Sequence, residues 1–222
     1  MYKLLFIDEQ QGDIDDFKDY VEKSTSKENI HIESEFPLED LDEMIDVIFG
    51  HNPDALITDF MLNEYKETIK YNVPYNGVEL VNKILEIREG FPCFVITSFD
   101  DDAVKISEDV NIVYIKGILH GAEDKIQAKA TFIDKIGSQI EHYKSRLQLS
   151  EARLSELLQK RIDGTASLPE EKEIIELDSF LEKAIDKRHS IPKEFKELSN
   201  LSKLDSILSK VDQLLNKSTN GK

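Results

Sequence analysis

The stretch PDALITDFML, residues 53–62, decides the fold that this sequence predicts. Its centre, ALITDF at 55–60, is a continuous apolar run that closes on an acid. Four similar short runs lie around it: YKLLFI (2–7), IHIESEF (30–36), CFVITSF (93–99) and IVYI (112–115). Continuous rather than alternating runs indicate strands covered on both faces, as in a parallel sheet. Because segments with helical apolar spacing separate the first runs, the pattern predicts a doubly wound α/β domain with five parallel strands.

The second half of the chain has a different pattern, with helical spacing and no strand signal. Apolar residues recur at steps of three and four over about 122–162, and the segment DGTASLP at 163–169 interrupts them. Two further helices are expected at about 169–188 and 193–217. The predicted organisation is therefore a domain at 1–121 followed by a helical, coiled-coil-like region at 122–222. A helix longer than about 25 residues seldom buries its apolar stripe on a small domain, so it packs on the later helices or on a second copy.

The charged residues are distributed unevenly along the chain, as the strand and helix patterns are. The chain has a formal net charge of −17, and residues 121–222 carry 18 acidic and 18 basic residues, so the whole excess lies in residues 1–120. An acidic front half and a rear half without a basic stripe disfavour nucleic acid as a partner. No apolar run approaches the length of a membrane span, and the start MYKLLFIDEQ does not continue as a signal peptide. Cytoplasm is the expected compartment, and the lone Cys93 is expected to be a buried thiol.

Polar residues follow the predicted strands where each one ends. Asp8 and Glu9 follow the first, Asp59 the third, Thr97 the fourth and Lys116 the fifth. The carboxyl ends of parallel strands meet at one edge of the sheet, where open α/β sheets bind their ligands. Acids gathered there repel one another unless a hard cation lies among them, and oxygen ligands suit Mg²⁺, which completes its shell with water and phosphate. The pattern therefore predicts a magnesium-dependent phosphoryl site.

In this order, the motifs LLFIDE, PDALITDFML followed by NGVELVNKI, FVITS and VYIK resemble the receiver domain of bacterial two-component response regulators. The resemblance covers residues 1–120 and implies a flavodoxin-like fold. It also implies that Asp59 is the phosphoacceptor and that Asp8 and Glu9 hold Mg²⁺ together with Asp59 and the backbone carbonyl of Met61. Thr97 would bind a phosphoryl oxygen, and Lys116 would pair with the phosphoryl group or with the Asp59 carboxylate.

Four features depart from the receiver pattern. Residues 61–76 form a longer segment than receivers have and are expected to make an extended loop over the acceptor. Glu9 stands where Asp is more common, Gly117 follows Lys116 in place of Pro, and Val113 replaces the usual aromatic residue. These departures bear on metal affinity and on how a phosphorylation signal would be transmitted.

The resemblance implies a signalling protein that is not an enzyme beyond intrinsic autodephosphorylation. A histidine kinase or phosphotransfer protein would donate the phosphoryl group from phosphohistidine, and the helical region would give the output through protein contacts, as a homodimer or with a partner protein, rather than through DNA. Two alternatives stay open: a degenerate receiver that serves as a phosphorylation-independent docking platform, and a phosphate sink or relay. A Mg²⁺-dependent phosphohydrolase is less favoured, because Phe60 and Met61 follow Asp59 where such enzymes need a second acid.

Overall fold

The computed structural model describes residues 1–24, 30–63, 70–97, 113–115 and 131–197. The chain divides into two compact units, Met1–Arg146 and Leu147–Lys222. The strands are β1 (Tyr2–Ile7), β2 (Ile30–Glu35), β3 (Ala55–Asp59), β4 (Cys93–Thr97) and β5 (Val113–Ile115). The helices are α1 (Gln11–Lys23), α2 (Leu41–His51), α3 (Gly77–Ile87), α5 (Phe132–Ile162), α6 (Leu168–Asp186) and the short 3₁₀ helix η5 (Lys187–His189).

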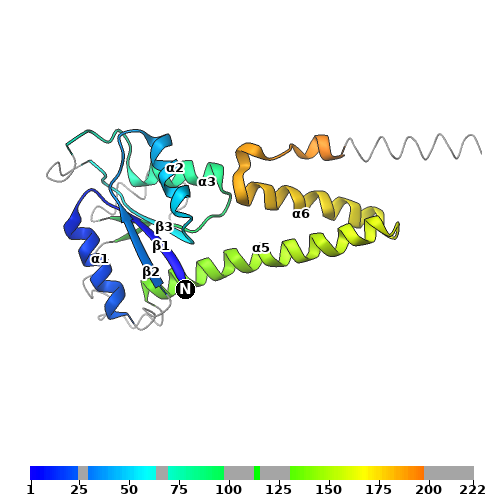
Figure 1. The fold of residues 1–222 in the computed structure, drawn as a ribbon, viewed down its shortest axis with the longest axis horizontal. Coiled ribbons are helices and arrows are strands. Elements are labelled where there is room, and N and C mark those ends of the chain that lie inside the picture. The colour runs from blue at the N-terminus through cyan, green and yellow to red at the C-terminus, as the bar shows by residue number, and fades with distance from the viewer. Residues whose placement is uncertain (25–29, 64–69, 98–112, 116–130, 198–222) are drawn as a thin grey trace, which may run out of the picture. The chain divides into compact units, whose positions relative to one another are not determined.

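The strands of the first unit form one sheet in the order β2-β1-β3-β4-β5, and every neighbouring pair is parallel (Figure 1). This is the strand order of the flavodoxin-like fold. The central strands read as continuous apolar runs because both of their faces are covered: all of β3 and β4 is buried. The prediction of an α/β fold with a parallel sheet, followed by a helical region, is confirmed.

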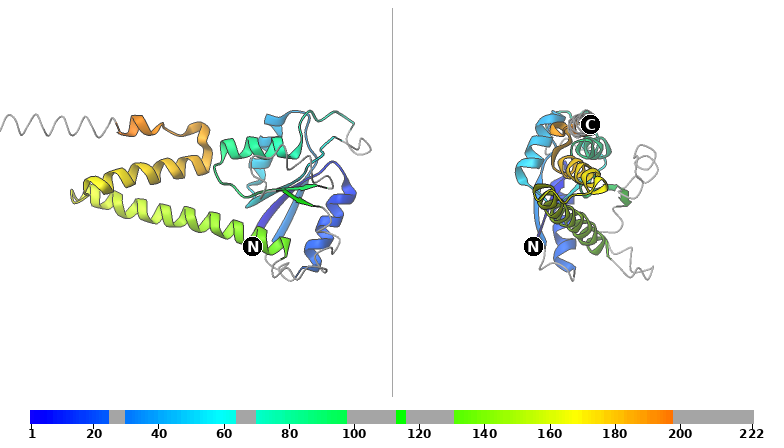
Figure 2. Two further views of the ribbon diagram at one scale, coloured as in Figure 1. Left: turned by 180° about the vertical axis from the view of Figure 1, so that it is seen from behind. Right: turned by 90° about the vertical axis from the view of Figure 1, so that its right-hand side faces the viewer.

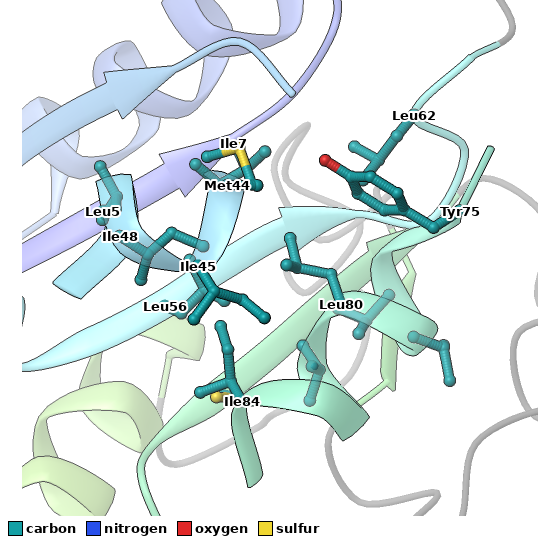
Figure 3. Close-up of a cluster of buried hydrophobic side chains, with 14 of the residues drawn as sticks. Leu5, Ile7, Met44, Ile45, Ile48, Leu56, Leu62, Tyr75, Leu80 and Ile84 are labelled. Carbon is teal, nitrogen blue, oxygen red and sulfur yellow. The ribbon is translucent and has the colours of Figure 1, made fainter. Parts of the chain in front are cut away.

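Alternate residues of the strands supply two cores on opposite faces of the sheet. Helices α2 and α3 cover one face, where Leu5, Leu56 and Val95 from the strands are buried with residues of both helices (Figure 3). Helix α1 covers the other face, where Phe6 and Phe17 bring their ring centroids within 4.7 Å (Figure 2). The sheet is therefore the middle layer of the first unit.

Helices α2 and α3 have start signals in the sequence that the structure uses. The Asp40 carboxylate accepts the N–H groups of Asp42 and Glu43 at the start of α2. At α3, the Asn76 side chain accepts the N–H of Glu79 while the Glu79 carboxylate accepts the N–H of Asn76, which is a capping box. These caps fix where each helix starts after its strand.

The first part of α5 belongs to the α/β unit, which extends to Arg146. The predicted boundary at 121/122 lies outside the described residues and stays a prediction. Phe132, Ile133, Ile136 and Ile140 are buried in the same core as α1. One turn later Lys144 pairs with Asp54 at 2.6 Å. The sheet needs a second helix beside α1 to cover that face, and α5 supplies it. The predicted helix residues before 131 lie outside the described part of the chain.

The described part of the second unit is a helical hairpin made by the end of α5 and by α6. The turn between them contains Gly164, whose φ of +69° is the left-handed conformation that glycine adopts most easily. Ion pairs join the two helices: Arg153 with Glu173 at 2.7 Å, Lys160 with Glu170 at 2.8 Å, and Arg161 with Glu171. The predicted helix at about 169–188 corresponds to α6, and only residues 193–197 of the last predicted helix are described.

In the described part of the chain, none of the helices combines the length and the apolar character that crossing a membrane requires.

Candidate functional site

Four of the predicted site residues lie at the carboxyl edge of the sheet. Asp59 is the last residue of β3 and Thr97 the last of β4, while Asp8 and Glu9 directly follow β1. In the parallel register Ile7 of β1 is level with Thr58 of β3, and Asp59 is level with Ile96 of β4. The next residues along the chain, Asp8 and Thr97, therefore follow on either side of Asp59. The strand topology thus brings these backbone positions to one edge, as the sequence predicts.

These four residues are buried although they are polar. Asp8 is 0 % exposed, Glu9 1 %, Asp59 5 % and Thr97 1 %. Removing a carboxylate from water is costly unless hydrogen bonds or charges compensate, so such burial is uncommon away from functional sites. Part of the compensation comes from backbone donors: Gln10 N–H donates to Asp8 Oδ1 at 2.9 Å, and Met61 N–H donates to Asp59 Oδ2 at 2.8 Å.

The backbone around Asp59 is held by a close approach that only glycine allows. A Cβ atom on Gly77, the first residue of α3, would lie 1.9 Å from the Asp59 carbonyl oxygen. Gly77 N–H donates to the Phe60 carbonyl at 2.9 Å, and Phe60 N–H donates to the Ile96 carbonyl at 2.9 Å. The end of β3 is therefore fixed between β4 and the start of α3. Sequence reasoning used Gly77 only as part of a motif and missed this steric role.

The long segment after Asp59 is anchored at both of its ends. Leu62, Val73 and Tyr75 are buried in the core beneath α2 and α3, and Figure 3 shows Leu62 beside the Tyr75 ring. The Tyr75 hydroxyl donates to the Leu38 carbonyl at 2.7 Å, and the Tyr71 hydroxyl donates to the Pro37 carbonyl at 2.8 Å. Burial raises the pKa of Tyr75 above the usual range, which keeps its hydroxyl a donor. These contacts were not predicted, although the alternation in YNVPY is a signal for them.

Lys116 lies outside the described residues, so its predicted place opposite Asp59 remains a prediction. So do the predicted roles of Thr97 and the Met61 carbonyl. Among the residues that are described, the structure has no group of three or more His, Cys, Asp or Glu side chains arranged to hold a metal ion. The predicted set of Asp8, Glu9 and Asp59 is therefore not found as a three-carboxylate cluster, although their backbones lie at one edge.

A second polar cluster lies on the outermost strand, β2. Its Glu33 pairs with Lys3 at 2.8 Å, and the two ring nitrogens of His51 contact Glu33 and Glu35 at 2.5 and 3.0 Å. Hydrogen bonds from Lys3 and then from His51 hold the pKa of Glu33 at about 2. We interpret this cluster as the link between the C-terminal end of α2 and the edge strand, because each carboxylate has a partner within it.

Cys93 is buried, as the sequence predicts, and burial raises the pKa of its thiol above the usual range. It therefore lacks the thiolate character of a reactive cysteine.

No known family model matches the chain, and no curated protein matches its sequence. Among solved structures it resembles the anti-anti-sigma factor PhyR from Bartonella quintana, with 14 % identity, a TM-score of 0.44, and coverage of 68 % of this chain and 51 % of that one. It also resembles the Mn²⁺-bound response regulator Rcp1, with 16 % identity, a TM-score of 0.40, and coverage of 59 % and 98 %. A third is the two-component response regulator RcsB in complex with DNA, with 19 % identity, a TM-score of 0.40, and coverage of 90 % and 98 %.

These matches are response regulators or a related signalling factor. Because all three TM-scores are below 0.5, the strand order and the strand-end residues carry the argument that follows, and the matches do not. The prediction that this chain does not bind nucleic acid is not confirmed, and it stays a prediction.

Proposed function

We propose that this chain is a response-regulator-like signalling protein whose α/β unit accepts a phosphoryl group on Asp59. The observation that supports this most directly is the burial of Asp8, Glu9 and Asp59 at the carboxyl edge of two adjacent parallel strands. This edge is where flavodoxin-like sheets bind ligands. Burying carboxylates is costly to a fold, so their burial at this edge fits a functional role better than a purely structural one.

In the proposed reaction, a carboxylate oxygen of Asp59 attacks the phosphorus of a phosphohistidine. A P–O bond forms, the P–N bond breaks, and the imidazole leaves with the bonding electron pair, so that Asp59 becomes an acyl phosphate. The Met61 N–H keeps Asp59 Oδ2 in place, which orients the carboxylate before the donor arrives. Thr97 and Lys116 then bind the phosphoryl oxygens through a hydroxyl and an ammonium group.

The donor types at this edge fit Mg²⁺. Asp8, Glu9 and Asp59 supply carboxylate oxygens and Met61 a carbonyl oxygen, all of which are ligands that Mg²⁺ prefers. Magnesium is usually held by one or two carboxylates together with waters and phosphate oxygens, so a complete protein cage is not required. The cation would neutralise part of the charge on the transferred group.

Output in this proposal runs through protein contacts of the helical region, and the donor is a histidine kinase or phosphotransfer protein. The chain is then a phosphoacceptor and not an enzyme. Helix α5 supports this division of roles, because it covers the sheet with its first residues and continues into the hairpin without a break.

Phosphorylation can be tested on the full chain with Mg²⁺ and acetyl phosphate or phosphoramidate, followed by intact mass measurement. We expect one added phosphoryl group on the wild-type chain and none on Asp59→Asn. The matched control is Asp46→Asn on the exposed side of α2, which should be phosphorylated as the wild type is. Omitting Mg²⁺ or adding a chelator should abolish the gain in mass.

A folded chain that gains no mass from either donor would contradict the proposal and favour the docking platform. Continuous release of phosphate from a generic ester would favour the phosphohydrolase instead.

A further inference from the structure

Large apolar side chains that are exposed to solvent are concentrated in the second unit. Of the eight in the described residues, only Met1 lies in the α/β unit. Six of the other seven form two groups. The first, which we name the turn patch, consists of Leu158, Ile162 and Leu168, and the second, the C-terminal patch, of Ile185, Ile191 and Phe195.

The turn patch lies on well-formed backbone. Leu158 and Ile162 are one helical turn apart on α5, so they share a face, and Leu168 opens α6 directly after the turn. The turn is closed by the Thr165 N–H, which donates to the Lys160 carbonyl at 2.9 Å, and by the Glu170 carboxylate, which accepts the Ser167 N–H at 2.8 Å. Yet Ile162 is 77 % exposed and Leu168 69 %. The patch is therefore part of an ordered surface.

Ion pairs and a hydrogen bond hold the backbone of the C-terminal patch in place. Lys196, whose side chain is only 10 % exposed, pairs with Asp178 at 2.5 Å and with Glu182 at 2.7 Å. The Ile191 N–H donates to the Glu182 carboxylate at 3.0 Å. These contacts hold the segment after η5 against α6 while leaving Phe195 65 % exposed.

The sequence that follows Lys196 is also rich in apolar residues. It continues with Leu198, Leu201, Leu204, Ile207, Leu208, Val211, Leu214 and Leu215. By its sequence, this part of the chain therefore adds apolar side chains to those of the two patches.

The charge distribution favours a second copy as the covering partner. Residues 147–222 carry 14 acidic and 13 basic residues, whereas residues 1–146 carry 31 acidic and 15 basic residues. Two copies therefore repel strongly through their α/β units but only weakly through their second units. A closed two-fold pairing uses the same surface on both copies, which suits a region with almost no net charge.

We propose that the turn patch and the C-terminal patch form the interface of a homodimer, with a second copy of this chain as their partner. The inference rests on the proposed function, which assigns the output to protein contacts of the helical region. The homodimer would be such a contact. Burial of the patches drives the association, so it proceeds without a phosphodonor.

The test is the mass of the full chain in solution, measured by sedimentation velocity and light scattering over a wide range of concentrations. The wild-type chain is expected to have twice the monomer mass. Ile162→Lys with Leu168→Lys, and separately Ile185→Lys with Phe195→Lys, should each raise the dissociation constant by about 100-fold or more, because each pair puts two charges into an apolar contact. The matched control is Ser138→Lys with Gln139→Lys, two exposed positions on the part of α5 that belongs to the α/β unit, which should leave the dimer intact.

Far-UV circular dichroism of each variant checks that the helices are retained, since all four substituted positions are exposed. A wild-type chain that stays monomeric at every concentration would overturn the inference. A dimer that both lysine pairs leave unchanged would overturn it too. Asp59→Asn should dimerise as the wild type does, so failure of phosphorylation and failure of dimerisation can be told apart.

Discussion

The α/β unit and the helical hairpin are stabilised in different ways. In the first, apolar residues from strands and helices are buried on both faces of a sheet. In the described part of the second, only a few apolar side chains are buried, among them Leu157, Ile174 and Ala184, while ion pairs join the helices at the surface. Surface ion pairs contribute about 0–1 kcal/mol each, whereas burying a large apolar side chain contributes about 1.5–3 kcal/mol.

This difference implies that the first unit is stable by its own packing and that the second depends on what covers it. A spectroscopic difference makes the two separately measurable: all seven Tyr residues lie between positions 2 and 143, so the near-ultraviolet tyrosine signal reports only the α/β unit. Far-ultraviolet circular dichroism reports the helices of both.

The largest effect is expected from Phe94→Ala in the sheet. Phe94 is fully buried on β4 and makes an edge-to-face contact with Phe132 of α5, with ring centroids 5.8 Å apart. Removing this ring should lower the free energy of unfolding of the α/β unit by about 3–5 kcal/mol, because a large cavity remains. Denaturant unfolding followed by the tyrosine signal measures it.

The control is Leu149→Ala on the hairpin, where the side chain is 72 % exposed. It should change stability by no more than about 0.5 kcal/mol. Equal losses from both variants would mean that the two regions do not differ as described.

An intermediate effect is expected from Gly77→Ala beside Asp59, the proposed phosphoacceptor. Its new Cβ would collide with the Asp59 carbonyl oxygen, so the end of β3 or the start of α3 must shift. Such overpacking costs about 1–3 kcal/mol, and phosphorylation by acetyl phosphate should slow because Asp59 moves. Gly12→Ala near the start of α1 is the matched control: no atom lies within 4 Å of its new Cβ, so it should be neutral or stabilising by up to about 1 kcal/mol. A normal phosphorylation rate in Gly77→Ala would show that this packing does not position Asp59.

The sequence was sufficient to predict the features that depend on short-range patterns of apolar and polar residues. Continuous apolar runs identified β1, β3 and β4 because buried parallel strands leave no polar face. The chain direction in a parallel sheet then places every strand-end residue at one edge, so Asp8, Asp59 and Thr97 could be grouped without knowing any distance.

It could not predict features that depend on contacts between distant segments. Ile136 and Leu157 of α5 belong to one helical stripe, yet the first is buried in the core of the α/β unit and the second is buried in the second unit. A periodic pattern does not say which neighbour each helical turn will contact, so the sequence could not show that the start of α5 is part of the α/β core. The hydroxyls of Tyr71 and Tyr75 likewise donate to the carbonyls of Pro37 and Leu38, which lie more than thirty positions earlier.

The smallest effect, and the one that sharpens the contrast most, is expected from acid. Hydrogen bonds from Lys160 and then from Ser167 hold the pKa of Glu170 at about 2, while hydrogen bonds from Lys3 and His51 do the same for Glu33 in the α/β unit. A carboxyl group whose pKa is lowered by folding stabilises the fold above its unfolded pKa, near 4.3, and this contribution is lost as the pH falls from there towards 2.

Both regions lose such a contribution over the same pH interval. Within the described residues the hairpin has no core as large as that of the α/β unit, so its helix signal should decline between pH 4.5 and about 2 while the tyrosine signal stays nearly constant. Glu170→Gln should weaken the hairpin at pH 7 and flatten its decline in acid, because the group that titrates is gone. If the tyrosine signal fell first on acidification, the α/β unit would be the less stable of the two, and the contrast drawn here would be reversed.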